Sequence, residues 1–244
     1  TNMMEIKEIP YLTADQMAEV DRLMVEVFRI HLIQMMENAG RHLAGLARNR
    51  FLEGDAVGKQ VVLLAGSGGN GGGAMVCARH LHNWGADVTV VLRSAVQDLV
   101  GTIKHQGEIL QQMDVEVGGF EDIKEKPRWD LIVDGIIGYS LQGAPRGAAA
   151  EMIRWANERK SPILALDLPS GLNASTGEVL EPTIRAAATM TLALPKEGLR
   201  RAGKKVVGEL YLADIGVPQE LYALAPLNMD VGPIFAKKQI LRLR

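Results

Sequence analysis

The sequence predicts an α/β protein with a three-layer, Rossmann-like fold, in which a mostly parallel, doubly wound sheet lies between helices. Short apolar runs alternate with helical segments from residue 60 onward, and these runs are continuously apolar. Strands of that kind are buried on both faces, as in a parallel sheet covered by helices. In addition, a glycine-rich stretch, GSGGNGGG at residues 66–73, directly follows the first apolar run.

Two helices are expected before the first strand. Thr13 and Gln16 have the spacing of a capping box, which predicts a helix that starts there and runs to about Phe28. The segment from His31 to Phe51 repeats apolar residues every three or four positions, so a second helix is expected to bury one face. We expect both helices to pack onto the sheet.

Strands and helices are then expected to alternate. Strands are predicted at residues 61–66, 88–92, 131–136, 163–168, 189–195 and 209–216, and helices at 74–84, 103–113 and 147–159. No internal repeat or linker divides the chain. A single domain is therefore expected over residues 1–244, with a core from about 12 to 218 and a poorly patterned tail over 219–244.

Composition excludes several classes of partner. With 27 basic and 29 acidic residues the net charge is -2, which gives no general attraction to nucleic acid or to an anionic membrane. No apolar run approaches the roughly 20 residues of a membrane span, and the first residues lack the pattern of a signal or transit peptide. The single cysteine, Cys77, indicates a reducing compartment. We expect a cytoplasmic protein that binds neither nucleic acid nor membrane.

The ends of the predicted strands carry the candidate ligand-binding residues, because ligands of such sheets bind beyond the carboxyl ends of the strands. The stretch GSGGNG matches G-x-G-x-x-G, which fits a phosphate at a helix start but also fits a purely structural turn. No lysine follows these glycines, so a Walker A loop is excluded. Arg93 stands where an acid for the ribose hydroxyl is expected, and it either faces a 2'-phosphate or is solvated.

Two carboxylates are expected at the same edge of the sheet. Asp134 and Asp167 each follow a buried apolar run, where a carboxylate suits a general base or a cation ligand, or simply caps the next turn. Asn70, Asp134 and Ser170 together offer oxygen ligands of the kind that alkali and alkaline-earth ions prefer. Asp214, which ends another apolar run, is interpreted as structural.

A set of motifs between about Leu12 and Pro218 resembles the NAD(P)H-hydrate epimerase family, the YjeF N-terminal domain. The motifs are Gln16-Met17 followed by Asp21, MENAGR at 36–41, the glycine loop before Ala78-Arg79, DGIIG at 134–138, DLPSGL at 167–172 with Thr176-Gly177, KEG at 196–198 and DIGVP at 214–218. The resemblance implies a Rossmann-like homodimer. It also implies that the substrate is hydrated NADH or NADPH, a damaged cofactor whose R and S epimers are interconverted.

The same resemblance implies the site residues. It places a potassium ion at Asn70, Asp134 and Ser170, and it makes Asp167 the catalytic residue, as acid/base or as stabiliser of a cationic intermediate. Lys196 is expected to meet a phosphate or to pair with Asp167, with solvation as the alternative. The implied nucleotide-binding residues are Gly69, Asn70, Gly71, Gly72, Gly73, Gly138, Tyr139, Ser140, Leu141, Gln142, Gly143, Ala144, Asp167 and Lys196.

One departure from the family pattern leaves alternatives open. The family loop reads G-x-G-N-N-G-G-D-G, whereas this chain has Gly69, Gly73 and Ala74 in place of the first Asn, the Asp and the last Gly. The expected function is epimerisation, with a separate hydrate dehydratase as functional partner. The alternatives are a non-catalytic nucleotide-binding or scaffold homologue with a degenerate loop, and an enzyme acting on another nucleotide.

Overall fold

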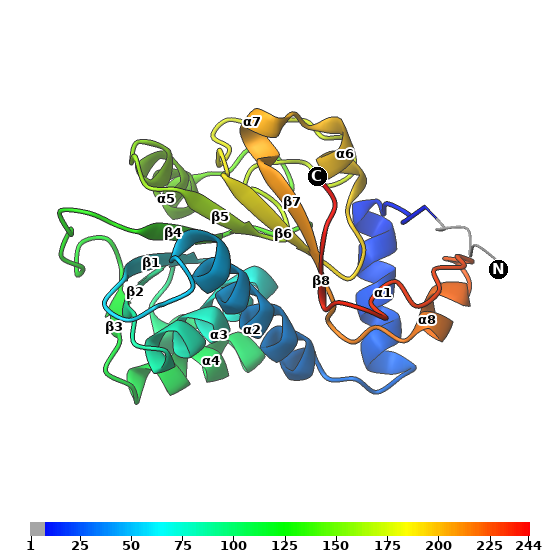
Figure 1. The fold of residues 1–244 in the computed structure, drawn as a ribbon, viewed down its shortest axis with the longest axis horizontal. Coiled ribbons are helices and arrows are strands. Elements are labelled where there is room, and N and C mark those ends of the chain that lie inside the picture. The colour runs from blue at the N-terminus through cyan, green and yellow to red at the C-terminus, as the bar shows by residue number, and fades with distance from the viewer. Residues whose placement is uncertain (1–7) are drawn as a thin grey trace.

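The computed structural model describes residues 8–244, which form one eight-stranded sheet with the strand order β3-β2-β1-β4-β5-β6-β7-β8 (Figure 1). Neighbouring strands are parallel except at the β7–β8 edge, which is antiparallel. The strands are β1 (Gln60–Ala65), β2 (Asp87–Leu92), β3 (Glu116–Gly118), β4 (Leu131–Gly135), β5 (Ile163–Leu166), β6 (Ala188–Leu192), β7 (Glu209–Ala213) and β8 (Ile240–Arg242). The predicted α/β fold with a mostly parallel, doubly wound sheet is confirmed.

Helices cover both faces of this sheet and one of its ends. The α-helices are α1 (Ala14–Glu26), α2 (Leu32–Phe51), α3 (Gly69–Asn83), α4 (Gly101–Gln111), α5 (Gly147–Asn157), α6 (Glu197–Arg201), α7 (Lys204–Val207) and α8 (Gln219–Ala223), and η1 (Val96–Asp98) is a 3-10 helix. In Figure 1, α2, α3 and α4 lie on one side of the sheet and α5 and α7 on the other, which gives the three predicted layers.

The central strand β1 explains why its sequence is continuously apolar. Val61 and Leu63 belong to the hydrophobic cluster that includes α2 and α3, whereas Val62 and Leu64 belong to the cluster on the α5 side. Successive side chains of a strand point to opposite faces, so each face of β1 meets its own layer of helices. All four side chains are fully buried.

The two N-terminal helices form where the sequence predicts them. The capping box of α1 is present: the Gln16 backbone amide donates to Thr13 Oγ1 at 3.2 Å, and the Thr13 amide donates to Gln16 Oε1 at 2.9 Å. Helix α2 packs on α3 and the sheet face. Helix α1 instead packs beyond the carboxyl end of the sheet, where Met17 shares a cluster with Leu194 and Ile215.

Helix α3 begins five residues earlier than predicted, at Gly69 instead of Ala74. Glycine lowers helix propensity, which is why the sequence indicated a loop here. Close packing overrides that preference. A Cβ atom on Gly71 would lie 1.8 Å from the Gly66 carbonyl oxygen, and one on Gly73 would lie 2.8 Å from Leu166 Cδ2. Gly71 is therefore required inside the helix because backbone atoms leave no room for a side chain, whereas a side chain at Gly73 would have to displace Leu166.

The tail after Pro218 adds to the fold, although its sequence pattern predicts no element. Leu221 and Tyr222 of α8 are buried in the cluster that contains α1. Strand β8 pairs with β7 and closes that edge of the sheet, with Leu241 opposite Leu212. Within residues 8–244, no helix is long and apolar enough to cross a membrane. The cytoplasmic location stays a prediction.

Candidate active site

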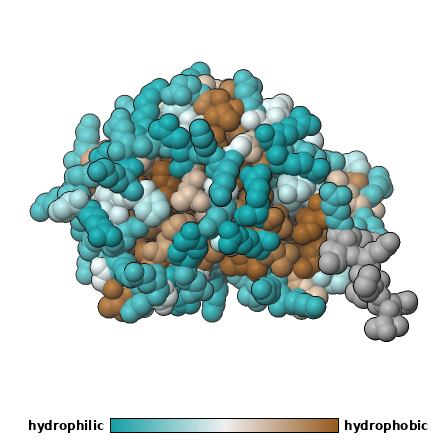
Figure 2. Space-filling model, turned by 45° about the horizontal axis from the view of Figure 1, so that its top comes forward, coloured by the Kyte–Doolittle hydropathy of each residue, from teal (hydrophilic) through white to brown (hydrophobic). Residues whose placement is uncertain are grey.

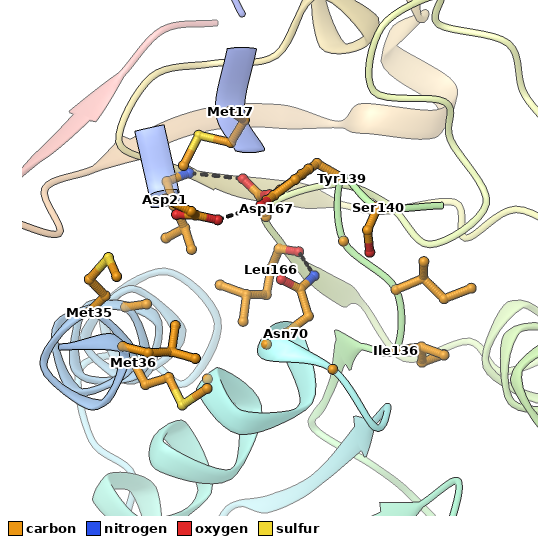
Figure 3. A pocket seen from close by; sticks show the side chains of 18 of the residues that line it. Met17, Asp21, Met35, Met36, Asn70, Ile136, Tyr139, Ser140, Leu166 and Asp167 are labelled. Atoms are coloured by element: carbon orange, nitrogen blue, oxygen red, sulfur yellow. Dashed lines mark hydrogen bonds between the residues drawn. The ribbon is translucent and has the colours of Figure 1, made fainter. Parts of the chain in front are cut away.

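A pocket of about 460 Å³ opens along the carboxyl ends of the strands, as expected for this type of sheet (Figure 3). Segments that follow β1, β2, β4, β5 and β7 reach it, and side chains from α1 and α2 cover it. Its apolar wall includes Met17, Met35, Met36, Ile136 and Leu166, and its polar side chains are Asp21, Ser67, Asn70, Arg93, Tyr139, Ser140 and Asp167. This composition suits a ligand with an apolar ring and several polar groups.

Asp167 lines the pocket, directly after β5. Its backbone has φ of 67°, in the left-handed region that residues other than glycine rarely adopt. The residue is 3% exposed, and Oδ1 accepts hydrogen bonds from Thr191 Oγ1 at 3.0 Å, from the Leu192 amide at 3.1 Å and from Lys196 Nζ at 2.6 Å. Within the described chain these bonds all go to Oδ1, so Oδ2 remains to face the pocket.

Lys196 is the cation that balances this carboxylate, and it is fully buried. Besides Asp167, its ammonium donates to the Leu192 carbonyl at 2.7 Å and lies 3.3 Å from Thr191 Oγ1. Leu12 pairs with Lys196 in a parallel β-bridge, in which the Leu12 amide donates to the Pro195 carbonyl and the Leu12 carbonyl accepts from the Glu197 amide. The sequence left three roles open for Lys196, which are contact with a phosphate, pairing with Asp167 and solvation. The structure shows the pairing with Asp167.

Asp21 and Tyr139 form a second polar pair in the same pocket, and Figure 3 shows them beside Asp167. The Tyr139 hydroxyl donates a short hydrogen bond to the Asp21 carboxylate. Burial raises the pKa of Asp21, and the Tyr139 hydrogen bond opposes that shift. Burial and the neighbouring carboxylate also raise the pKa of Tyr139, so its hydroxyl keeps its proton.

Sequence reasoning did not assign Asp21 to the site. The signal available was weak: Asp21 and Met17 are four residues apart on α1, so they share a helix face, and both line the pocket. No local sequence pattern indicates that this face of α1 lies against the carboxyl ends of the strands. The contact with Tyr139 spans 118 positions and forms only when α1 packs there.

The glycine loop divides into two parts. Gly69 lines the pocket, and a Cβ atom there would meet nothing within 4 Å. Gly71 and Gly72 do not line it, because they pack inward against Gly66 and Met36. Gly73 does line it, but the Leu166 side chain fills the space beside it. The start of α3 is therefore open to a ligand at Gly68 and Gly69, where unpaired helix amides favour an anion.

Asp134 and Ser170 meet below the pocket and are both fully buried. The Ser170 hydroxyl donates to Asp134 Oδ1 at 2.5 Å, the Ser170 amide donates to Oδ2 at 2.8 Å, and the Ile136 amide donates to Oδ1 at 3.2 Å. Burial raises the pKa of Asp134 to about 6, although these hydrogen bonds act in the opposite direction. None of the ion pairs found within residues 8–244 involves Asp134.

The remaining predicted residues are distributed along the pocket edge. The Asn70 amide nitrogen donates to the Leu166 carbonyl at 2.8 Å, so this side chain connects the start of α3 to the end of β5. Gly138, Tyr139 and Ser140 line the pocket. The last four residues of the predicted segment, which are Leu141, Gln142, Gly143 and Ala144, continue toward α5 without lining it.

A doubly wound sheet with an apolar and polar pocket across its strand ends, closed by a buried Asp–Lys pair, defines a Rossmann-like α/β protein with a small-molecule site. The chain belongs to the family described as YjeF-related protein N-terminus, whose model matches residues 32–198. The resemblance stated from the motifs is thereby confirmed.

Individual relatives agree with this assignment. The chain is 39% identical to a protein named NAD(P)H-hydrate epimerase from Dehalogenimonas lykanthroporepellens, over 95% of this chain and 92% of the relative. It is 37% identical to a bifunctional NAD(P)H-hydrate repair enzyme from Moorella thermoacetica, over 89% of this chain but 42% of that longer protein. The crystal structure of the yeast protein ynu0 matches with a TM-score of 0.81 and 25% identity, over 96% of this chain and all of that one.

Proposed function

We propose that this protein interconverts the R and S epimers of hydrated NADH and NADPH. The names of its relatives support the reaction, and one observation in the site carries the proposal. Asp167 presents a carboxylate oxygen to the pocket while its other oxygen is held by Lys196, Thr191 and the Leu192 amide. A scaffold has no use for a buried ion pair at the end of a cavity, because burying two charges costs free energy.

The chemistry of the substrate explains what such a carboxylate does. The hydroxyl is on a carbon next to the ring nitrogen, so the nitrogen lone pair forms a C=N bond while the C–O bond breaks and its electron pair leaves with oxygen. A proton converts the departing oxygen to water, and an iminium ion remains. Water then adds to the other face and releases a proton. Asp167 stabilises the positive charge of the ring and exchanges a proton with the water.

The Asp21–Tyr139 pair supplies a second place for that proton. Burial favours the protonated form of Asp21, and Tyr139 connects it to the segment after β4. Leaving and entering water need a donor and an acceptor that exchange roles, which two neighbouring carboxylates provide. Met17, Met35 and Met36 form the apolar wall against which the reduced ring packs.

We also propose a potassium ion at Asn70, Asp134 and Ser170, and the chemistry of the donors fits it. Asp134 is a fully buried carboxylate that forms no ion pair with a cationic side chain among residues 8–244. A buried charge requires compensation by an opposite charge. Its hydrogen bonds occupy three of about four lone-pair sites, which leaves one for a cation. Such an ion would fix Asp134 and Ser170 and attract a ligand phosphate.

In this function a hydrate dehydratase that accepts one epimer is the functional partner, as the bifunctional relatives suggest by name.

A homodimer is part of the proposal. Figure 2 shows apolar side chains gathered in patches on an otherwise hydrophilic face. The exposed apolar residues near the α1–α2 connection, which are Val25, Val27, Leu32 and Ile33, are the surface we expect the dimer to bury.

The decisive experiment supplies the R epimer of hydrated NADPH to an S-specific dehydratase with ATP and follows the recovery of NADPH absorbance. We expect this protein to accelerate recovery. Asp167→Asn is expected to abolish the acceleration, whereas the matched control Asp214→Asn, at another strand end outside the pocket, keeps it. No acceleration by the folded protein, or full activity of Asp167→Asn, would overturn the proposal.

A further inference from the structure

We propose that Arg93 selects the phosphorylated cofactor, so that hydrated NADPH is preferred over hydrated NADH. This inference rests on the proposed function and goes beyond it, since it names the form of the substrate. Arg93 directly follows β2, is exposed and lines the pocket beside Ser67, Gly68 and Gly69. Its guanidinium makes no hydrogen bond or ion pair with any described residue, so its donors are available to a ligand.

The backbone at Arg93 is nevertheless held in place. Its amide donates to the Ala65 carbonyl at 3.2 Å, which extends the β1–β2 pairing by one residue. The guanidinium is therefore carried by a fixed strand end next to the start of α3. A planar guanidinium on a rigid support is well suited to a phosphate, which it binds through two parallel hydrogen bonds.

The strand order sets the separation between Arg93 and the reacting end of the pocket. From β2 to β5 the order is β2-β1-β4-β5, so three strand spacings lie between Arg93 and Asp167. At about 4.8 Å each this amounts to roughly 14 Å. The open amides at Gly68 and Gly69 lie between them. A dinucleotide extended along this edge places its reduced ring at Asp167, its diphosphate at α3 and its adenosine ribose at Arg93.

The charges around the pocket point the same way. Its carboxylates are Asp21 and Asp167, and both lie at the far end from Arg93. A protein that prefers the non-phosphorylated cofactor places an acid near the ribose, where it accepts hydrogen bonds from the free hydroxyls. Here the corresponding strand end carries a cation instead. A 2'-phosphate meets an arginine there, and the free hydroxyl meets no carboxylate.

The test measures binding and activity separately. Dissociation constants are determined by calorimetry for NADP⁺ and NAD⁺, and for adenosine 2',5'-bisphosphate and AMP, with the wild type, Arg93→Ala, Arg93→Asp and the control Arg128→Ala. Arg128 is also an exposed arginine, but it lies just before β4, at the amino ends of the strands and away from the pocket. The kcat/KM values of the same variants are then measured with hydrated NADPH and with hydrated NADH. The Arg93 side chain is exposed, and its guanidinium makes no hydrogen bond or ion pair with a described residue, so its variants are expected to fold.

We expect the wild type to prefer each phosphorylated ligand by about tenfold or more, since hydrogen bonds between charged groups have about that value. Arg93→Ala should remove this preference, Arg93→Asp should reverse it, and Arg128→Ala should retain it. Equal binding of both forms by the wild type, or an equal loss for both forms in Arg93→Ala, would overturn the role of Arg93. If epimerisation continues in those cases, the proposed function stands; a wild type that neither binds dinucleotides nor epimerises overturns both.

Discussion

Lys196 Nζ lies 2.6 Å from Asp167 Oδ1, and the two side chains are 0% and 4% exposed. The pair connects the end of β5 to the start of α6, so it joins the Asp167 carboxylate to the segment with which Leu12 forms a β-bridge. In a buried pair each charge depends on the other, because neither can be solvated alone.

Breaking this pair is expected to affect stability and activity differently. Lys196→Met should lower the free energy of unfolding by about 3–5 kcal/mol, because it leaves a buried carboxylate without a cation. Asp167→Asn should reduce kcat by roughly 10²–10⁴-fold. The double variant should lose less stability than the sum of the single losses. Denaturant unfolding measures the stability losses, and the coupled epimerase assay measures kcat. Additive stability losses would show that the two charges are not coupled.

The stability of the protein should depend on pH through Asp21. Burial raises the pKa of Asp21 in the folded protein, so the folded state binds this proton more tightly than the unfolded state. Stability therefore falls as pH rises from about 4, the unperturbed value, through the raised folded pKa. Asp21→Asn lacks this loss and should gain stability relative to the wild type over that interval. Thermal melting against pH measures it, with the exposed Asp15→Asn on the same helix as control.

Two glycine positions should respond in opposite ways to the side chains found in the family loop. A Cβ atom on Gly69 has open space, so Gly69→Asn should fold normally and tighten NADP⁺ binding by about fivefold through one added hydrogen bond. A Cβ atom on Gly73 would lie 2.8 Å from Leu166 Cδ2, so Gly73→Asp should cost about 1–3 kcal/mol of stability. Unfolding and binding measurements check both; a destabilised Gly69→Asn with an unchanged Gly73→Asp would contradict the packing argument.

Potassium should stabilise the protein through Asp134. Replacing potassium by a large organic cation at constant ionic strength is expected to lower the melting temperature and to weaken NADP⁺ binding, because the buried carboxylate loses its counter-ion. Asp134→Asn should no longer respond to the exchange, and Asp214→Asn should respond like the wild type. Identical melting of the wild type in both salts would show that no such ion is bound.

Much of the fold could be predicted from local sequence patterns. The capping box at Thr13 and the apolar runs of β1, β4 and β5 depend on neighbours within a few residues, so they can be found in the sequence. The sequence predicts Asp134 and Asp167 at the same edge of the sheet, because the carboxyl ends of parallel strands lie along one edge. The start of α3 could not be predicted, since local propensity argues against a helix at Gly69–Gly73.

The sequence by itself determined the two N-terminal helices, the alternation of six strands with helices, the glycines after β1 and the carboxylates at the strand ends, because these follow from periodicity and turn chemistry. The tertiary structure alone decided that Lys196 is buried on Asp167, that Asp21 meets Tyr139 and that Gly71 and Gly73 serve packing. Apart from the packing of Gly71 against Gly66, these contacts join segments far apart in the chain. Their partners are chosen by how whole elements pack, which no local pattern contains.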